Sequence, residues 1–192
     1  MKSLVLGSSS PYRKELLNKL GLPFETCSPD IDETPLPNET PDELVLRLAL
    51  SKAKAVAELH PNSLIISSDQ VSVLNGIING KPKSKERAFA QLKASSGNVI
   101  SFHTSLCLYD ATDKTYQLES EPYCVHFRTL SDQAIHRYIE KEKPLNCAGS
   151  FKSEGLGIAL FEKLEGRDPN TLIGLPLILL IQMLNKKAID IP

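Results

Sequence analysis

Residues 4–17 read LVLGSSSPYRKELL and take the chain from a short apolar strand directly into a helix. Three serines stand where this helix begins, and a hydroxyl side chain is a favoured N-cap. Pro11 suits the first helical turn, and two cations follow at Arg13 and Lys14. Because a helix N-terminus has unpaired N–H groups and a partial positive charge, the junction predicts a phosphate-binding site. Tyr12 adds an aromatic ring beside it, and the combination suggests a nucleotide ligand.

The composition is that of a globular protein with a sizeable core. The chain has 192 residues, of which 41% are hydrophobic and 23% are charged, and these values predict a single domain over residues 1–192. A net charge of −1 gives no basis for binding nucleic acid through bulk electrostatics. A nucleotide would therefore have to be bound by locally placed cations.

The cysteines and the apolar segments suggest where the protein works. The four cysteines lie far apart and show no metal-binding spacing; they are Cys27, Cys107, Cys124 and Cys147. With no recognisable secretory signal, we expect reduced, partly buried thiols and a cytoplasmic location. The apolar run at 175–181 is too short to span a bilayer, so it predicts a C-terminal helix packed on the core and no membrane partner.

Helical and alternating segments do not follow one another strictly along the chain. This order predicts an α/β fold with a mixed sheet that contains antiparallel pairs and is flanked by helices, rather than a doubly wound parallel sheet. The expected elements after the first helix are a strand at 24–27, a helix from 41 to about 60, a strand at 64–68, a hairpin at 71–78, a helix at 84–92, an antiparallel pair at 99–109 and 116–127, a helix from 131, a glycine-rich loop at 144–174 and a last helix.

Two carboxylates are candidates for catalysis. Asp69 is expected to end the apolar strand at 64–68, where α/β proteins commonly place catalytic groups, although an ordinary turn-capping Asp explains the position as well. Glu33 lies in an acidic, proline-rich loop, and the sequence alone favours a solvated surface loop there. If the two carboxylates converge, they could hold a divalent cation and leave one oxygen to polarise water.

Three further charged residues could contact a nucleotide. Lys52 is on the polar face of the helix that starts at 41, where most lysines are simply solvated. Lys81 stands in a short glycine–proline loop, where a fixed cation can meet a phosphate at little entropic cost. Glu154 lies within the glycine-rich residues 148–157, and its carboxylate could accept the N1–H and N2–H₂ hydrogen bonds of guanine, although the residue taken alone is better explained as an exposed loop acid.

Six short motifs occur in one order along the chain: SSSPYR with ELL at 8–17, SDQ at 68–70, GKP at 80–82, GSF at 149–151, EGLG at 154–157 and GLP at 174–176. Together they resemble the Maf nucleotide pyrophosphatases over residues 4–184, nearly the whole chain. The resemblance implies an elongated Maf or ITPase-like fold of two lobes with a central cleft. It also implies hydrolysis of a nucleoside triphosphate between its α and β phosphates.

The resemblance assigns roles to individual residues. It implies that Asp69 is the proton acceptor and that Glu33 and Asp69 bind a divalent cation, Mg²⁺ or Mn²⁺. The phosphate-binding residues that it implies are Ser8, Arg13, Lys52 and Lys81. It is also compatible with a homodimer.

Three positions are implied to select the base: Tyr12, Gln70 and Glu154. The branch of the family that acts on dTTP and UTP typically has Arg, Thr and Gln there, whereas the branch that acts on 7-methyl-GTP usually has Trp, Gln and Glu. The chain resembles the second branch, with Tyr in place of Trp, so the expected reaction is hydrolysis of 7-methyl-GTP to 7-methyl-GMP and pyrophosphate. The alternatives are a broader house-cleaning enzyme acting on GTP, dTTP or UTP, and a non-catalytic nucleotide-binding regulator of septum formation.

Overall fold

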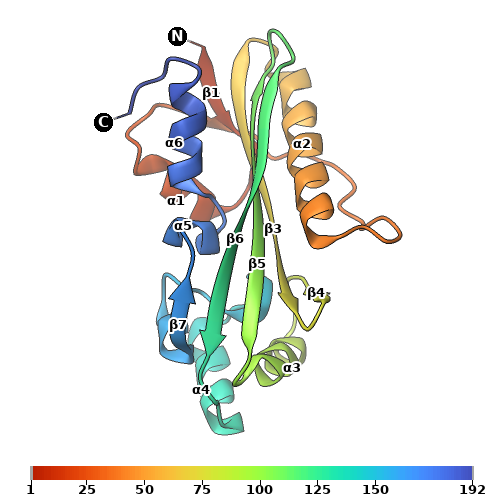
Figure 1. The fold of residues 1–192 in the computed structure, drawn as a ribbon, viewed down its shortest axis with the longest axis vertical. Helices are drawn as coiled ribbons and strands as arrows, with labels where there is room; N and C mark the ends of the chain where they lie inside the picture. The colour runs from red at the N-terminus through yellow and green to blue at the C-terminus, as the bar shows by residue number, and fades with distance from the viewer. Residues whose placement is uncertain (1, 192) are drawn as a thin grey trace. The chain divides into compact units, whose positions relative to one another are not determined.

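The computed structural model describes residues 2–191 and has the predicted α/β fold with a mixed, seven-stranded sheet (Figure 1). The strand order is β2-β1-β3-β5-β6-β7, and β4 pairs with β3. Strands β1 and β2 are parallel, as are β1 and β3, whereas β3 and β4 and also β6 and β7 are antiparallel. The strands are β1 (Ser3–Leu6), β2 (Glu25–Thr26), β3 (Ser63–Leu74), β4 (Ile77–Asn79), β5 (Val99–Asp110), β6 (Tyr116–Phe127) and β7 (Phe161–Glu165).

Helices and the three long strands are divided between two compact units. Unit 1 comprises Met1–Asp69, Thr104–Glu121 and Asp168–Pro192, and unit 2 comprises Gln70–His103 and Pro122–Arg167. The α-helices are α1 (Pro11–Asn18), α2 (Pro41–Leu59), α3 (Lys85–Ser95), α4 (Asp132–Glu142), α5 (Pro169–Ile173) and α6 (Leu177–Asn185). Two 3₁₀ helices, η1 (Ala148–Ser150) and η2 (Leu156–Leu160), lie between α4 and β7.

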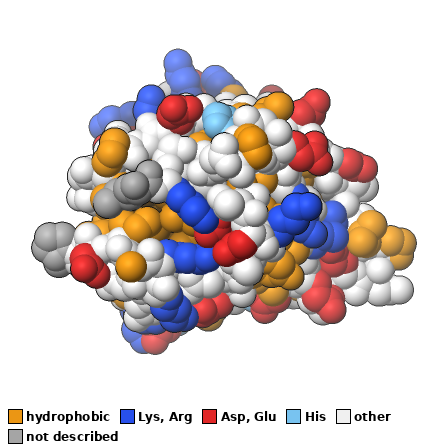
Figure 2. Space-filling view, turned by 90° about the horizontal axis from the view of Figure 1, so that it is seen from above, with side chains coloured by type: hydrophobic (Ala, Val, Ile, Leu, Met, Phe, Trp, Pro, Cys, Tyr) orange, Lys and Arg blue, Asp and Glu red, His pale blue; other side chains and the backbone are white. Residues whose placement is uncertain are grey.

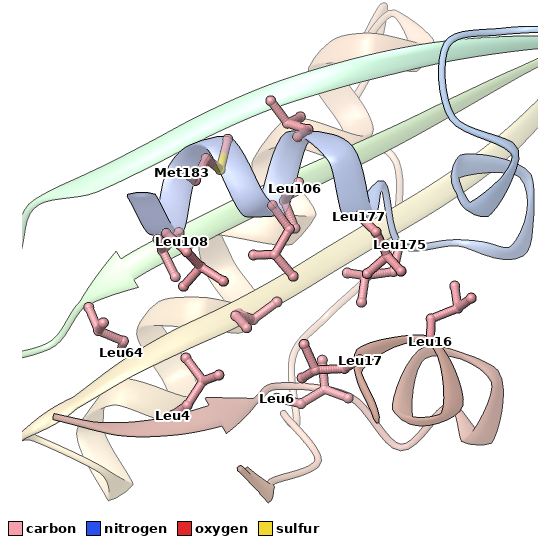
Figure 3. Close-up of a cluster of buried hydrophobic side chains, with 14 of the residues drawn as sticks. Leu4, Leu6, Leu16, Leu17, Leu64, Leu106, Leu108, Leu175, Leu177 and Met183 are labelled. Carbon is pink, nitrogen blue, oxygen red and sulfur yellow. The ribbon is translucent and has the colours of Figure 1, made fainter. Parts of the chain in front are cut away.

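In unit 1, helices cover both faces of the sheet, because its strands are apolar on both sides. Helix α2 packs on one face through small and β-branched residues such as Ala49, Ala53 and Val56. On the other face, α1 and α6 bury a leucine-rich cluster from β1, β3 and β5 (Figure 3). The C-terminal apolar run is thus a core-packed helix, as predicted.

Local sequence fixes where the unit 1 helices begin. Ser10 is the N-cap of α1, with its hydroxyl accepting from the Arg13 amide, and Pro11 occupies the first turn. Thr40 and Glu43 form a reciprocal capping box at the start of α2. Gly7 connects β1 to α1 where a Cβ would lie 3.3 Å from the Val56 side chain of α2, so a larger residue there would require that side chain to shift.

Unit 2 has its own aromatic core. Phe151 packs edge-on against three other phenylalanine rings, with centroid distances between 4.8 and 5.6 Å; these rings are Phe102, Phe127 and Phe161. Helices α3 and α4 pack together, with Phe89 stacked on His136 at 4.5 Å. Phe151 of the GSF motif therefore has a packing role.

Two predictions about secondary structure are wrong. Residues 64–68 and the first arm of the predicted hairpin form one continuous strand, β3, so Asp69 lies within a strand and not at its end. The sequence predicts a loop at 144–174, but this segment contains η1, η2, β7 and α5. Strand β7 has the sequence FEKLE, which is short, charged and mostly exposed, and it is held by its antiparallel pairing with β6.

The two ends of the described chain meet at one buried carboxylate. Asp110, at the end of β5, accepts from the ammonium groups of Lys2 at 2.6 Å and Lys187 at 3.1 Å. Burial alone would raise the pKa of Asp110, but these hydrogen bonds outweigh it and hold the pKa at about 2. Basic and acidic side chains lie next to one another on the face seen in Figure 2.

None of the four cysteines, all of which lie within residues 2–191, forms a disulfide, and Cys107 is buried. Burial raises the pKa of the Cys107 thiol to about 12, so this sulfur is a packing group and not a nucleophile. Within residues 2–191, the structure contains no helix with both the length and the apolar character needed to cross a membrane.

Candidate active site

The candidate site of unit 1 is built on three successive residues of β3, whose side chains alternate between the two faces of the sheet. Ser67 points toward α2 and donates to the Ala49 carbonyl at 2.7 Å. Ser68 points to the opposite face and donates to the Gly174 carbonyl at 2.8 Å. Asp69 faces α2 again, and this alternation fixes which side of the sheet its carboxylate occupies.

Asp69, Lys52 and Glu33 form one charged cluster. The Lys52 Nζ atom lies 2.5 Å from Asp69 Oδ1 and 2.7 Å from Glu33 Oε1. Lys52 and Asp69 are both buried, while the Glu33 side chain is 57% exposed. The interpretation of Lys52 as a solvated surface lysine is therefore wrong: α2 turns it inward, one helical turn after Ala49.

The backbone of Asp69 is held by a residue that sequence reasoning did not identify. Its amide donates to Ser105 Oγ at 3.1 Å, and the Ser105 hydroxyl donates to the Val45 carbonyl of α2 at 2.6 Å. Ser105 is fully buried in β5, next to the apolar residues 106–108. A buried hydroxyl in such a strand is the signal that could have marked it as a positioning residue.

Arg13 contacts the same part of β3 from the other side. Its Nε atom donates to the Gly174 carbonyl at 2.9 Å, and Nη1 donates to the Ser68 carbonyl at 2.8 Å. Burial lowers the pKa of Arg13, while the nearby Asp69 and Glu33 charges act to raise it. The Gly174 carbonyl accepts from both Arg13 and Ser68, so the turn before α6, the start of α1 and β3 are joined at one atom.

The helix start that predicts an anion site is present in unit 1. Ser8 is buried, and its hydroxyl accepts from the Ser10 amide at 3.1 Å. Tyr12 is half-buried in the first turn of α1. The loop that carries Glu33 is held to α2 by Arg47, which binds both carboxylate oxygens of Glu39, and these hydrogen bonds lower the pKa of Glu39 to about 2.

The other predicted residues belong to unit 2. Gln70 follows Asp69 directly in β3 and is half-buried. Lys81 is exposed in the loop after β4, and Glu154 is exposed in the turn before η2. The roles predicted for these three residues, and the cleft between two lobes, stay predictions.

The glycine-rich segment of unit 2 approaches its own backbone closely. A Cβ on Gly157 would lie 2.2 Å from the Lys152 carbonyl oxygen, so only glycine fits there. The turn is fastened to α4, since the Lys152 amide donates to the Tyr138 hydroxyl and the Leu156 amide donates to Glu142 Oε1. These glycines therefore build the turn that presents Glu154.

A divalent cation fits the donor set of the charged cluster. Among the described residues, no group of three or more His, Cys, Asp or Glu side chains is placed to hold a metal. However, Glu33 and Asp69 direct two hard oxygen donors at a single atom, Lys52 Nζ. Mg²⁺ and similar ions are commonly bound by one or two carboxylates together with substrate phosphates, and these two carboxylates meet that requirement.

A cavity of about 330 Å³ lies elsewhere in unit 1, between the sheet edge at β2 and the C-terminal segment. It is lined mainly by apolar residues, including Leu4, Phe24 and Ile189. None of the predicted site residues lines it, so it is not part of the candidate site.

Comparisons with known proteins agree with this fold. A crystal structure of protein VC0702 from Vibrio cholerae is similar to the chain, with a TM-score of 0.50 and 12% sequence identity over 98% of each chain. At that identity, the similarity concerns the fold alone. The family model described as Maf-like protein matches residues 3–187. Since this match covers nearly the whole sequence, the chain belongs to the Maf-like family.

Proposed function

We propose that this chain is a nucleoside triphosphate pyrophosphatase that hydrolyses 7-methyl-GTP to 7-methyl-GMP and pyrophosphate. The observation that carries the proposal is the buried Asp69 carboxylate of unit 1, which lies beside Lys52 and Glu33. The residue before it in β3, Ser68, accepts a hydrogen bond from Arg13 of α1 through its carbonyl. Family membership supports the reaction class, because Maf proteins are generally nucleoside triphosphate pyrophosphatases and hence hydrolases.

The reaction needs an aligned water and charge neutralisation more than covalent catalysis. A water oxygen attacks the α phosphorus, the bond from that phosphorus to the α–β bridging oxygen breaks, and pyrophosphate leaves with the bridging oxygen. Asp69 accepts the proton of the attacking water. Lys52, Lys81, Arg13 and the Ser8 end of α1 offset the phosphate charge. A divalent cation bound by Glu33 and Asp69 would add further positive charge at the phosphates.

The choice of 7-methyl-GTP rests on Tyr12, Gln70 and Glu154. Methylation at N7 makes guanine cationic, so stacking on an aromatic ring gains a cation–π contribution of about 1–2 kcal/mol. The Glu154 carboxylate can accept two hydrogen bonds from the guanine edge and attract the positive base. The turn that carries Glu154 is held to α4 by hydrogen bonds to Tyr138 and Glu142. This attachment favours recognition of guanine by Glu154 over the role of a mobile surface acid.

A second candidate is a broader pyrophosphatase that also accepts unmethylated GTP. The observation in its favour is that Tyr12 is a smaller stacking surface than the Trp typical of the 7-methyl-GTP branch. It predicts similar kcat/KM values for GTP and 7-methyl-GTP.

The experiment is pyrophosphate release from 7-methyl-GTP, GTP, dTTP and UTP, each with Mg²⁺ and with Mn²⁺. The proposal predicts the highest kcat/KM for 7-methyl-GTP. Preference for dTTP or UTP would exclude the substrate assignment, and equal rates for GTP and 7-methyl-GTP would favour the broader enzyme. Nucleotide binding without any turnover would favour the regulator of septum formation.

We also propose that the protein is a homodimer and is located in the cytoplasm. Its ligand is a nucleotide, and it binds neither nucleic acid nor a membrane. The absence of disulfides among the four described cysteines supports a reducing compartment. Light scattering coupled to size exclusion tests the dimer, and a monomeric mass at working concentration would contradict it.

A further inference from the structure

The cation position between Glu33 and Asp69 is held by the protein's own Lys52 ammonium. Lys52 Nζ is 2.7 Å from Glu33 and 2.5 Å from Asp69, so it lies where two carboxylates would bind a metal ion. We propose that Lys52 holds this position in the nucleotide-free protein, gives it up to a divalent cation that arrives with the nucleotide, and then pairs with a phosphate. The inference rests on the proposed function for the identity of the cation and its phosphate ligands.

Electrostatics make the exchange necessary. An ammonium and a divalent cation cannot share two carboxylate oxygens at bonding distance, because two positive charges a few ångströms apart repel strongly in a buried site. Lys52 and Asp69 are both buried, so solvent screens this repulsion less than it would between two surface charges. Binding of the metal therefore requires that the lysine head group move.

The geometry of the cluster allows that movement. Lys52 is anchored on α2 by its backbone, but its ammonium ends a flexible four-carbon stem. Glu33 is the exposed member of the cluster and lies in the loop that precedes α2, so the position opens to solvent on the Glu33 side. Displacement can thus occur by side-chain rotation without breaking the Ser105 hydrogen bond that holds the Asp69 backbone.

The exchange also makes metal binding depend on the nucleotide. Two carboxylates already paired with a lysine are a poor metal site by themselves, and no third acidic, His or Cys ligand accompanies them within residues 2–191. A triphosphate supplies both the missing metal ligands and a new partner for the displaced ammonium. The free ion should consequently bind weakly and the metal–nucleotide complex strongly, which prevents Asp69 from being blocked by metal when no substrate is present.

The test is Mn²⁺ binding, measured by electron paramagnetic resonance without any turnover. Lys52→Met removes the competing ammonium, so without nucleotide it should bind Mn²⁺ at least about tenfold more tightly than wild type. Lys52→Arg keeps a cation and should stay close to wild type. Lys54→Met is the matched control, since Lys54 is exposed on the same helix and should not change the affinity.

The outcomes separate this inference from the proposed function. Unchanged or weaker Mn²⁺ binding by folded Lys52→Met would overturn it, as would a gain that persists when Glu33→Gln is added. Lys52→Gln is measured in parallel, and if neither neutral variant folds while Lys54→Met does, the inference fails, because a protein that needs the ammonium to fold cannot release it. If the wild-type protein lacks pyrophosphatase activity, the proposed function is refuted, but the Mn²⁺ affinities of the variants still test this inference.

Discussion

Replacing Ser105 with alanine should damage both stability and turnover, because this hydroxyl positions Asp69. The Ser105 side chain is fully buried and joins the Asp69 amide to the Val45 carbonyl. Alanine takes the hydroxyl acceptor away from a buried amide, which costs about 1–3 kcal/mol, and removes a buried hydrogen bond of about 1 kcal/mol. We expect the free energy of unfolding to fall by about 2–4 kcal/mol.

Urea denaturation followed by circular dichroism measures this change, since the chain has no Trp for fluorescence. In steady-state assays on 7-methyl-GTP, kcat should fall by about tenfold or more with little change in KM, because the proposed function has Asp69 act in the chemical step.

Ser67→Ala is the matched control. Ser67 is equally buried on the same strand and also donates to α2, but it makes no hydrogen bond to Asp69 in this structure. It should lose about 1 kcal/mol of stability and keep kcat within about threefold of wild type. If Ser105→Ala retains wild-type stability and turnover, or if Ser67→Ala loses kcat to the same extent, the positioning argument is refuted.

Three other changes test separate parts of the structure. Folding lowers the pKa of Asp110 from about 3.8 to about 2, so its ionised carboxylate contributes about 2 kcal/mol to the free energy of unfolding at a pH above 3.8. This contribution is lost as the pH falls from about 4 to 2. In acid-unfolding experiments, Asp110→Asn should abolish that loss. Glu154→Gln should reduce the ratio of kcat/KM for 7-methyl-GTP over GTP, and an unchanged ratio would exclude base recognition by Glu154. Gly157→Ala places a Cβ against the Lys152 carbonyl and should shift the turn. We expect it to lower both the melting temperature and the ratio of kcat/KM for 7-methyl-GTP over GTP. Wild-type values of both quantities would contradict this expectation.

The sequence could predict elements whose signals are local. A serine N-cap before Pro11, the start of α2 at Pro41 and the mixed sheet follow from caps, prolines and hydrophobic periodicity, and the structure confirms them, with Ser10 as the cap. Strand β7 could not be predicted in this way, because it depends on pairing with β6 and not on its own charged sequence.

The same division applies to the candidate site. Asp69, Lys52 and Glu33 could each be identified from residue type and motif, but their convergence is a property of how α2 packs on β3. Ser105 carries no motif at all, and its importance appears only when β5 is placed beside β3. The wrong prediction that the strand ends at Asp69 also has a cause in the tertiary structure. Strand β3 continues to Leu74, beyond the residues that pair with β1, because it pairs there with other strands.

Product analysis of 7-methyl-GTP hydrolysis is the most direct test of the central claim, that Asp69 activates water for attack on the α phosphorus. The wild-type protein, with Mg²⁺ or Mn²⁺, should yield 7-methyl-GMP and pyrophosphate, and folded Asp69→Asn should yield neither at a comparable rate. Formation of 7-methyl-GDP and phosphate, or undiminished turnover by Asp69→Asn, would contradict the account.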